Sequence, residues 1–546
     1  MRNRVFVIGL DAATFTLVDP WIEEGYLPNL ERVIKEGARG ALRSSVPYVS
    51  STAWASFITG KNPGKHGIMD FAIREPGSYD IRLLNASDIG GSTLWTLLSE
   101  GEKRLAAINC PVTYPPQSVN GLLVTGMLTP SMRSSFTYPP SFRETLLERI
   151  PHYRIEPALA TSDLRKTKRD MAEGVIVGAQ AREEATYFTM EQLPDWDFFM
   201  VVFIEPDRVQ TYLWDDMDPS HPRHDPRSPY RDSILSHYRQ LDGIIGRLLD
   251  KVLDGRTTVL IMSDHGFLGV HRFVYPNKWL EREGYLRVRG GQGMAMLKAG
   301  LRRAGLAGPA KRLMSRFLPS LALTTQWRAS SFIRNVDWTK TRVFWGADNG
   351  FSINVKGREP NGIVEPGLAY ETLREEIIEG FRGLRDPVSG EEVVHSVVKR
   401  EDIYQGPFLE RSPDLRVIWK EYPEQRKTYF PAGDLWSNDI FGQTNLSGDH
   451  ALHGILLACG NHIRHGTVSG AQIVDVAPTI LHLLDLPVPE DMDGHVLLDC
   501  LDDDLISTRP VRYAAPGRED SGGEKGYSDE ENEELRERLR GLGYLA

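Results

Sequence analysis

The sequence predicts an α/β protein built on a large, mostly parallel sheet with helices on both faces. Three uninterrupted apolar runs, Val5–Leu10, Phe198–Ile204 and Val259–Met262, are typical of strands that are covered on both faces. Between the second and third runs, apolar residues recur at helical spacing from 234 to 249. Strand, helix and strand in this order form a βαβ unit, which favours parallel strands.

Each of these runs is followed by an aspartate, which indicates a ligand site at one edge of the sheet. Asp11, Asp207 and Asp264 follow the first, second and third runs, and His265 comes directly after Asp264. In an open α/β sheet, ligands bind at the carboxyl ends of the strands. Three carboxylates that meet there repel one another unless a cation lies between them, and zinc-like ions accept carboxylate and imidazole donors. The alternative for Asp11 is a helix cap or a turn residue, and the alternative for Asp264 and His265 is a polar turn after the strand.

Composition excludes several classes of protein. The chain has 546 residues, enough for one large core with insertions or for two to three domains. Its formal net charge of −10 does not indicate extensive nucleic-acid binding. Cys110, Cys459 and Cys500 form no CxxC pair, which argues against a disulfide framework or a thiolate metal site. The sequence shows neither a signal-peptide pattern nor a membrane-spanning run, so we expect a cytoplasmic protein.

Hydroxyl residues cluster before a predicted helix near the N-terminus. Ser50, Ser51 and Thr52 precede the apolar-periodic segment Ala53–Ile58, as at a helix N-terminus. One interpretation is a simple cap. The other is a nucleophilic hydroxyl held where backbone N–H groups and the helix dipole can meet a phosphate.

A basic stretch at 284–336 contrasts with the acidic chain. It contains no aspartate or glutamate, and we predict a helical insertion. It is either a solvated cap on an acidic face, or a surface that captures an anionic substrate or makes peripheral membrane contact. Its cations are Arg287, Arg289, Lys298, Arg302, Arg303, Lys311, Arg312, Arg316, Arg328 and Arg334.

Six motifs in order resemble the alkaline phosphatase superfamily, within it the nucleotide pyrophosphatase/phosphodiesterase-like branch. They are LDAAT, VSSTAW with TGKNPGKHG, EPDRVQ, SDHGF, SGDHALHG and DVAPTIL. The resemblance covers Val5 to Leu498 and implies a mostly parallel sheet between helices with an inserted, partly helical cap. We therefore expect a catalytic core at 1–275 and 441–505, a cap with return strands at 276–440, and a charged tail with a terminal helix at 506–546.

The resemblance also implies a site with two divalent ions, usually zinc, with manganese or magnesium as alternatives. Carried over to this chain, Asp11, Asp264 and His265 would hold the ion that touches the nucleophile, and Asp207 and His450 would hold the other. The spacing to Thr59-Gly60 places the nucleophile, itself a ligand of the first ion, at Ser50; a slip of one or two residues would move it to Ser51 or Thr52.

Two positions depart from the family pattern. Thr211 stands where the second ion normally has a histidine, and a hydroxyl is a poor substitute for imidazole on zinc. Downstream residues could replace the missing ligand, namely Asp215, Asp216, His221 and His224. The family's phosphate-contacting asparagine after the nucleophile is also absent, and Ala53 stands there.

These residues predict a metal-dependent phosphohydrolase, acting on a phosphodiester rather than a monoester. The substrate would be a phosphorylated small molecule, a nucleotide or a lipid head group, and not a nucleic-acid duplex. Two paired ions can stabilise the attacking and the leaving oxygen of an in-line displacement. The alternatives are a phosphomutase or phosphotransferase of the same superfamily, and a degenerate member that binds an anion without turning it over.

Overall fold

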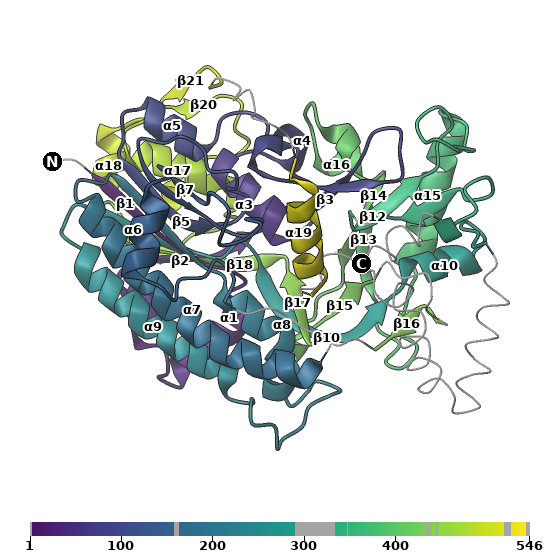
Figure 1. The fold of residues 1–546 in the computed structure, drawn as a ribbon, viewed down its shortest axis with the longest axis horizontal. Helices are drawn as coiled ribbons and strands as arrows, with labels where there is room; N and C mark the ends of the chain where they lie inside the picture. The colour runs from purple at the N-terminus through teal and green to yellow at the C-terminus, as the bar shows by residue number, and fades with distance from the viewer. Residues whose placement is uncertain are drawn as a thin grey trace.

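A nine-stranded sheet forms the centre of the computed structural model (Figure 1). The strand order is β19-β2-β18-β9-β1-β8-β5-β6-β7. The central strands β9, β1, β8, β5 and β6 are parallel, whereas β18 runs antiparallel to both β9 and β2. The predicted mostly parallel sheet is confirmed. The strands are β1 Arg4–Leu10, β2 Ala38–Arg43, β5 Leu105–Cys110, β6 Gly121–Thr125, β7 Thr137–Tyr138, β8 Phe198–Phe203, β9 Thr257–Met262, β18 His453–Gly460 and β19 Gly466–Thr467.

The structure describes residues 3–157, 163–289, 334–346, 348–432, 437, 439–443, 446–517 and 526–541. Within these ranges, no helix has the length and apolar character needed to cross a membrane.

Helices cover both faces of the sheet because each buried strand presents apolar side chains to both sides. In β1, Val5 and Val7 pack into one hydrophobic core and Phe6 and Ile8 into the other. The first core lies under α3 Ser50–Thr59, α5 Leu94–Glu100 and α17 Val476–Leu483. The second lies under α1 Phe15–Glu23, α2 Pro28–Glu36, α7 Leu164–Gln192, α8 Glu205–Met217 and α9 Ser233–Val252.

A second unit follows the core strands and has its own four-stranded antiparallel sheet, in the order β11-β12-β14-β13. A third hydrophobic core lies between this sheet and its helices. The elements are α10 Pro276–Arg282, β11 Val343–Trp345, β12 Gly350–Ile353, α15 Leu368–Arg382, β13 Val394–Lys399 and β14 Leu415–Trp419. The larger part of the predicted basic helical cap, 290–333, lies outside the described residues. The domain boundaries given above remain a prediction.

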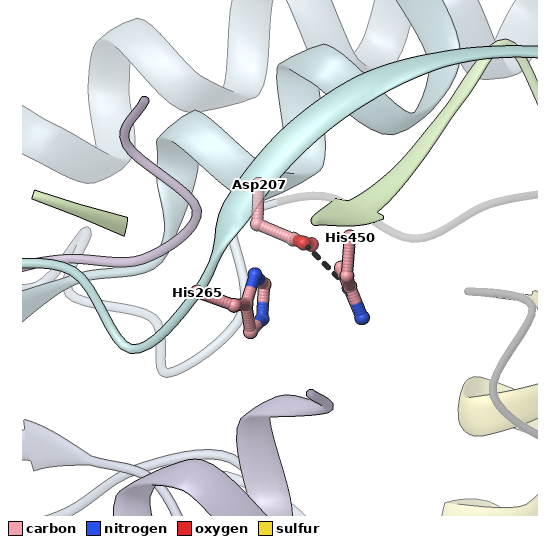
Figure 2. A group of neighbouring side chains, drawn as sticks. All are labelled: Asp207, His265 and His450. Carbon is pink, nitrogen blue, oxygen red and sulfur yellow. Dashed lines mark hydrogen bonds and ion pairs between the residues drawn. The ribbon is translucent and has the colours of Figure 1, made fainter. Parts of the chain in front are cut away.

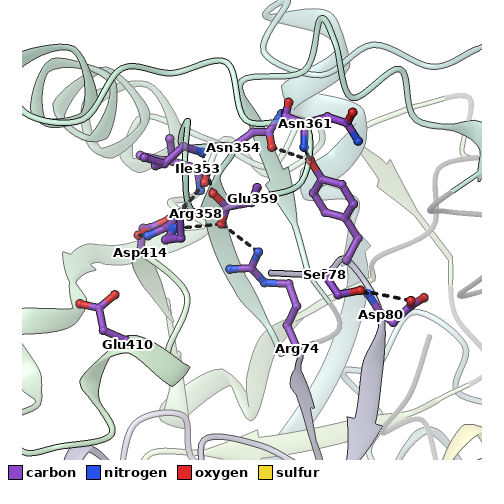
Figure 3. Close-up of polar contacts among 12 residues, drawn as sticks. Arg74, Ser78, Asp80, Ile353, Asn354, Arg358, Glu359, Asn361, Glu410 and Asp414 are labelled. Carbon is purple, nitrogen blue, oxygen red and sulfur yellow. Dashed lines mark hydrogen bonds and ion pairs between the residues drawn. The ribbon is translucent and has the colours of Figure 1, made fainter. Parts of the chain in front are cut away.

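Ion pairs and hydrogen bonds join this unit to the hairpin β3 Ala72–Arg74 and β4 Ile81–Leu83 (Figure 3). Arg74 donates to Glu359 at 2.8 Å, and the Tyr79 hydroxyl donates to Asn354 at 2.7 Å. Arg358 binds Glu359 at 2.8 Å and Asp414 at 2.6 Å. The Glu359 carboxylate is therefore shared by an arginine from each unit.

A strand that we did not predict follows His265. Residues Gly266–Val274 form β10, which pairs antiparallel with β17 Gly448–Ala451 and parallel with β15 Lys427–Pro431. In this register His450 lies opposite Phe267. The pairing brings His450, which is distant in sequence, next to the end of β9.

The predicted terminal helix is α19 Asp529–Gly541. Leu535 and Leu539 from this helix are buried in the first core, and Arg536 donates to the Ile81 carbonyl at 2.8 Å. Figure 1 shows this helix, in yellow, between the core and the second unit. The helix is thus docked by an apolar face, although its composition is highly charged.

His66 joins the end of α4 Pro63–His66 to α3, and its environment fixes its tautomer. Its Nδ1 accepts the Ile68 N–H at 3.1 Å, so Nε2 carries the proton and donates to Ser56 Oγ at 3.0 Å. Burial lowers the pKa of His66 to about 3 from its usual 6.5. Protonation would also turn Nδ1 into a donor facing the Ile68 N–H.

We expect acid to destabilise the fold through this histidine. Below pH 6.5 this histidine binds a proton in the unfolded chain but stays neutral in the folded protein. The free energy of unfolding therefore decreases by about 1.4 kcal/mol for each pH unit that the solution is made more acidic. Urea midpoints between pH 7.5 and 5.0 measure the slope, and His66→Gln should show a shallower one. Equal slopes in wild type and variant would contradict this assignment.

Candidate active site

The three predicted aspartates meet at one edge of the sheet. Asp11 follows β1, Asp264 follows β9, and Asp207 lies in the first turn of α8, directly after β8. Parallel pairing aligns the strand ends, with Leu10 opposite Phe203. All three aspartates are at most 1% exposed. The sheet therefore places three carboxylates together out of water.

A first cluster consists of Asp11, Asp264 and His265, whose donor atoms lie within 4.8 Å of one another. His265 Nε2 is 3.2 Å from Asp264 Oδ2 and 3.7 Å from Asp11 Oδ1. Asp264 Oδ1 accepts the Ala12 N–H at 3.2 Å, whereas Oδ2 is buried without a hydrogen-bond partner. This oxygen is available to a ligand.

Ser50 is the first residue of α3, and its side chain points into the first cluster. Its Oγ lies 3.2 Å from His265 Nε2 and 3.5 Å from Asp11 Oδ1. The hydroxyls of Ser51 and Thr52 are buried without hydrogen-bond partners. Of the three hydroxyls considered from the sequence, the structure brings Ser50 to the acids.

One turn further along α3, Trp54 also contacts Asp11, a role that the sequence did not reveal. Its indole Nε1 donates to Asp11 Oδ2 at 3.2 Å. The ring packs over β1 at Gly9, where an added Cβ would lie only 2.7 Å from the indole. Gly9 is therefore required for this close approach, which fixes Asp11 relative to Ser50.

The hydrogen bonds of His265 assign its protons. Nδ1 lies 3.1 Å from the Gly266 carbonyl oxygen, which can only accept, so Nδ1 carries the proton. The Nε2 lone pair therefore faces Ser50 and the two carboxylates. This is the tautomer in which an imidazole binds a metal through Nε2.

A second cluster shares His265 with the first and adds Asp207 and His450 (Figure 2). His450 Nε2 lies 3.2 Å from Asp207 Oδ2, and the two imidazole centroids are 3.9 Å apart. The sequence interpretation assigned His265 to one ion only, whereas the structure places it within both groups of donors.

The residues considered as replacements for the missing histidine contact other partners. Asp215 and Asp216 both bind Lys168, at 2.8 and 2.7 Å. His221 Nε2 lies 2.9 Å from the Val270 carbonyl oxygen, and His224 Nδ1 lies 3.0 Å from that of Asp215. Among the described residues, none of these four belongs to either cluster. Thr211 is on α8, one turn after Asp207.

Arg208, which the sequence interpretation did not single out, is next to the second cluster. Its guanidinium donates to Asp207 Oδ1 through one terminal nitrogen and to Glu156 Oε2 through Nε, the latter at 3.2 Å. The Arg208 and Glu156 side chains are 1% and 4% exposed. The signal in the sequence is the Asp-Arg pair inside EPDRVQ, because a buried arginine needs an acidic partner.

The electrostatics of the two clusters differ. Burial, and then the charges of Asp264 and Asp207, raise the pKa of Asp11 well above its usual range. Burial raises the pKa of Asp264 to about 7 and lowers that of His265 to about 4. Burial also acts to raise the pKa of Asp207, but Arg208 and the imidazoles outweigh it and the pKa falls. The negative charge of Asp207 is thus already balanced by neighbouring groups, whereas the negative charges of Asp11 and Asp264 are not.

The large central sheet flanked by helices is an α/β fold of the alkaline phosphatase type. The chain is similar to phosphonoacetate hydrolase from Sinorhizobium meliloti 1021 in complex with phosphonoformate, with a TM-score of 0.53 at 13% identity over 89% of this chain and 95% of that chain. It is also similar to a variant of the alkaline phosphatase PafA, with a TM-score of 0.50 at 14% identity over 92% and 99%. No curated protein sequence matches the chain.

The family model described as type I phosphodiesterase / nucleotide pyrophosphatase matches residues 5–423. The chain belongs to this family, as the motifs predicted. It is accordingly a hydrolase of phosphoric ester bonds.

Proposed function

We propose that this protein is a metal-dependent phosphodiesterase in which Ser50 attacks phosphorus beside two divalent ions. The observation that carries the proposal is the position of Ser50 Oγ, 3.2 Å from His265 Nε2 and 3.5 Å from Asp11 Oδ1. A hydroxyl at a helix N-terminus, next to a buried set of metal donors, fits phosphoryl transfer.

The donor set fits divalent cations. Asp11, Asp264 and His265 would hold one ion with Ser50, and Asp207, His450 and the shared His265 would hold the other. Asp264 Oδ2 is buried and accepts no hydrogen bond, and burial and mutual repulsion disfavour the ionised forms of Asp11 and Asp264, so a bound cation would stabilise both carboxylates. Bound ions would supply Lewis-acid stabilisation of the attacking and leaving oxygens, and zinc suits this mixture of carboxylate and imidazole.

The residues of this chain orient the reaction. Trp54 and Ala12 fix Asp11 and Asp264 by donating one hydrogen bond to each, at 3.2 Å in both cases. The first turn of α3 has no side-chain cap, so its backbone N–H groups can meet the phosphoryl oxygens. Ser50 is the first residue of that turn. Its oxygen would bond to phosphorus as the bond from phosphorus to the ester oxygen breaks, and the departing alcohol would take up the proton that Ser50 loses; water would then release the phosphoryl group from Ser50.

The test uses bis(p-nitrophenyl) phosphate and p-nitrophenyl phosphate with the purified full-length protein. We expect faster turnover of the diester, loss of activity on chelation and recovery with zinc, manganese or magnesium. Chelator-resistant turnover would contradict the metal requirement, and a preference for the monoester would contradict the diesterase assignment. Transfer of the phosphoryl group to an added alcohol in preference to water would instead support the phosphotransferase alternative.

Restoring the family pattern at Thr211 should strengthen the second ion site. Thr211→His adds an imidazole one helical turn after Asp207, where both side chains can reach the same ion. We expect the second zinc to bind at least about 10-fold more tightly and hydrolysis to be faster. Calorimetric zinc titration of wild type and variant measures the change. Two equally tight zinc sites in the wild type would show that the second site does not lack a ligand at position 211.

A further inference from the structure

The two clusters carry different charge when their carboxylates are ionised. The first contains two carboxylates, and among the described residues no lysine or arginine forms an ion pair with Asp11 or Asp264. The second contains one carboxylate, Asp207, which already binds the Arg208 guanidinium. With neutral imidazoles, the first cluster has a charge of −2, whereas the Asp207–Arg208 pair is neutral. Glu156, which pairs with Arg208, and Asp449, 3.8 Å from His450 Nδ1, are further carboxylates beside the second cluster but do not belong to its donor group.

Arg208 is held in place by contacts on both sides. Glu156 binds its Nε at 3.2 Å, and both side chains are almost fully buried. The two carboxylate oxygens of Asp207 have different partners: Oδ1 contacts Arg208 and Oδ2 contacts His450. A divalent ion that binds Asp207 must therefore share this carboxylate with the Arg208 guanidinium. The two positive charges repel each other strongly, because the dielectric constant of this buried site is low.

We propose that Arg208 makes the two metal sites unequal: the first binds its ion tightly, and the second binds weakly because the guanidinium supplies part of the positive charge beside Asp207. The inference rests on the proposed two-ion function and deepens it. Arg208 is a positioning residue that fixes Asp207. The weak ion at the second site exchanges with solution while the first remains bound.

The experiment is calorimetric zinc titration of the metal-free full-length protein. We expect wild type to bind one ion tightly and a second at least about 100-fold more weakly, because the first donor group offers two carboxylates without a cationic partner, whereas the carboxylate of the second already binds Arg208. Arg208→Gln should tighten the second site by about 10-fold or more and change the first less, because the guanidinium forms its ion pair with Asp207 and acts on Asp11 without direct contact. Arg208→Lys keeps the charge and should keep the weak second site.

Two further variants keep the test decisive should Arg208→Gln fold poorly. Glu156→Gln removes the negative charge behind Arg208, so the second ion should bind still more weakly, opposite in sign to Arg208→Gln. Arg358→Gln is the control, since it breaks an ion pair with the buried Asp414 in the second unit, outside both donor groups, and should move neither affinity.

The outcomes separate the two proposals. Two equal sites in wild type, a second site that Arg208→Gln leaves unchanged or weakens, or a second site that Glu156→Gln tightens, would each overturn the role of Arg208 while leaving metal-dependent catalysis intact. A wild-type protein that binds no ion would overturn the proposed function itself.

Discussion

Ser50→Ala should abolish diester hydrolysis, lowering kcat by at least about 10³-fold, because it removes the oxygen that we propose attacks phosphorus. The Oγ atom lies within hydrogen-bonding distance of His265 Nε2, and no other hydroxyl of the first turn of α3 has such a contact among the described residues. Steady-state kinetics with bis(p-nitrophenyl) phosphate measure the loss. Binding of the first ion should survive, since Asp11, Asp264 and His265 remain.

The neighbouring hydroxyls provide matched controls. Ser51→Ala and Thr52→Val remove buried hydroxyls that have no hydrogen-bond partner, so neither change breaks an interaction. We expect kcat within a few-fold of wild type and unchanged stability. An inactive Thr52→Val together with an active Ser50→Ala would show that the nucleophile is two residues further on.

Asp264→Asn should remove tight metal binding and most turnover. The amide keeps the size of the side chain and the hydrogen bond from the Ala12 N–H, but it halves the negative charge of the first cluster. We expect ion affinity to fall at least about 100-fold and kcat at least about 10³-fold. Zinc titration and the same kinetic assay measure both.

The stability of the Asp264→Asn variant in the presence of a chelator distinguishes a role of Asp264 in metal binding from a role in the fold. Without an ion, the variant should be at least as stable as wild type, because it removes a buried charge that repels Asp11. Asp242→Asn is the contrasting control: this buried carboxylate accepts the Asn29 and Leu30 N–H groups and should cost stability but leave kcat unchanged. A strongly destabilised metal-free Asp264→Asn protein would indicate a structural role.

The sequence predicted the parallel core because its evidence is local. Uninterrupted apolar strands and the helix at 234–249 follow from residue type and spacing alone, and all are present as β1, β8, β9 and α9. The acids after those strands could be assigned to one edge because parallel strands all end on the same side. The choice of Ser50 over its neighbours relied on the family spacing to Thr59-Gly60, and the Ser50→Ala and Thr52→Val variants test it.

By itself, then, the sequence determined the fold class, the family and the three aspartates at the sheet edge. Only the tertiary structure decided how the second cluster is assembled. His450 reaches it through the pairing of β10 with β17, a register between segments far apart in the chain that local periodicity does not encode. Likewise, Arg208 and Glu156 meet only after folding, and their burial at low dielectric strengthens the charge effect that underlies the proposed difference between the two ion sites.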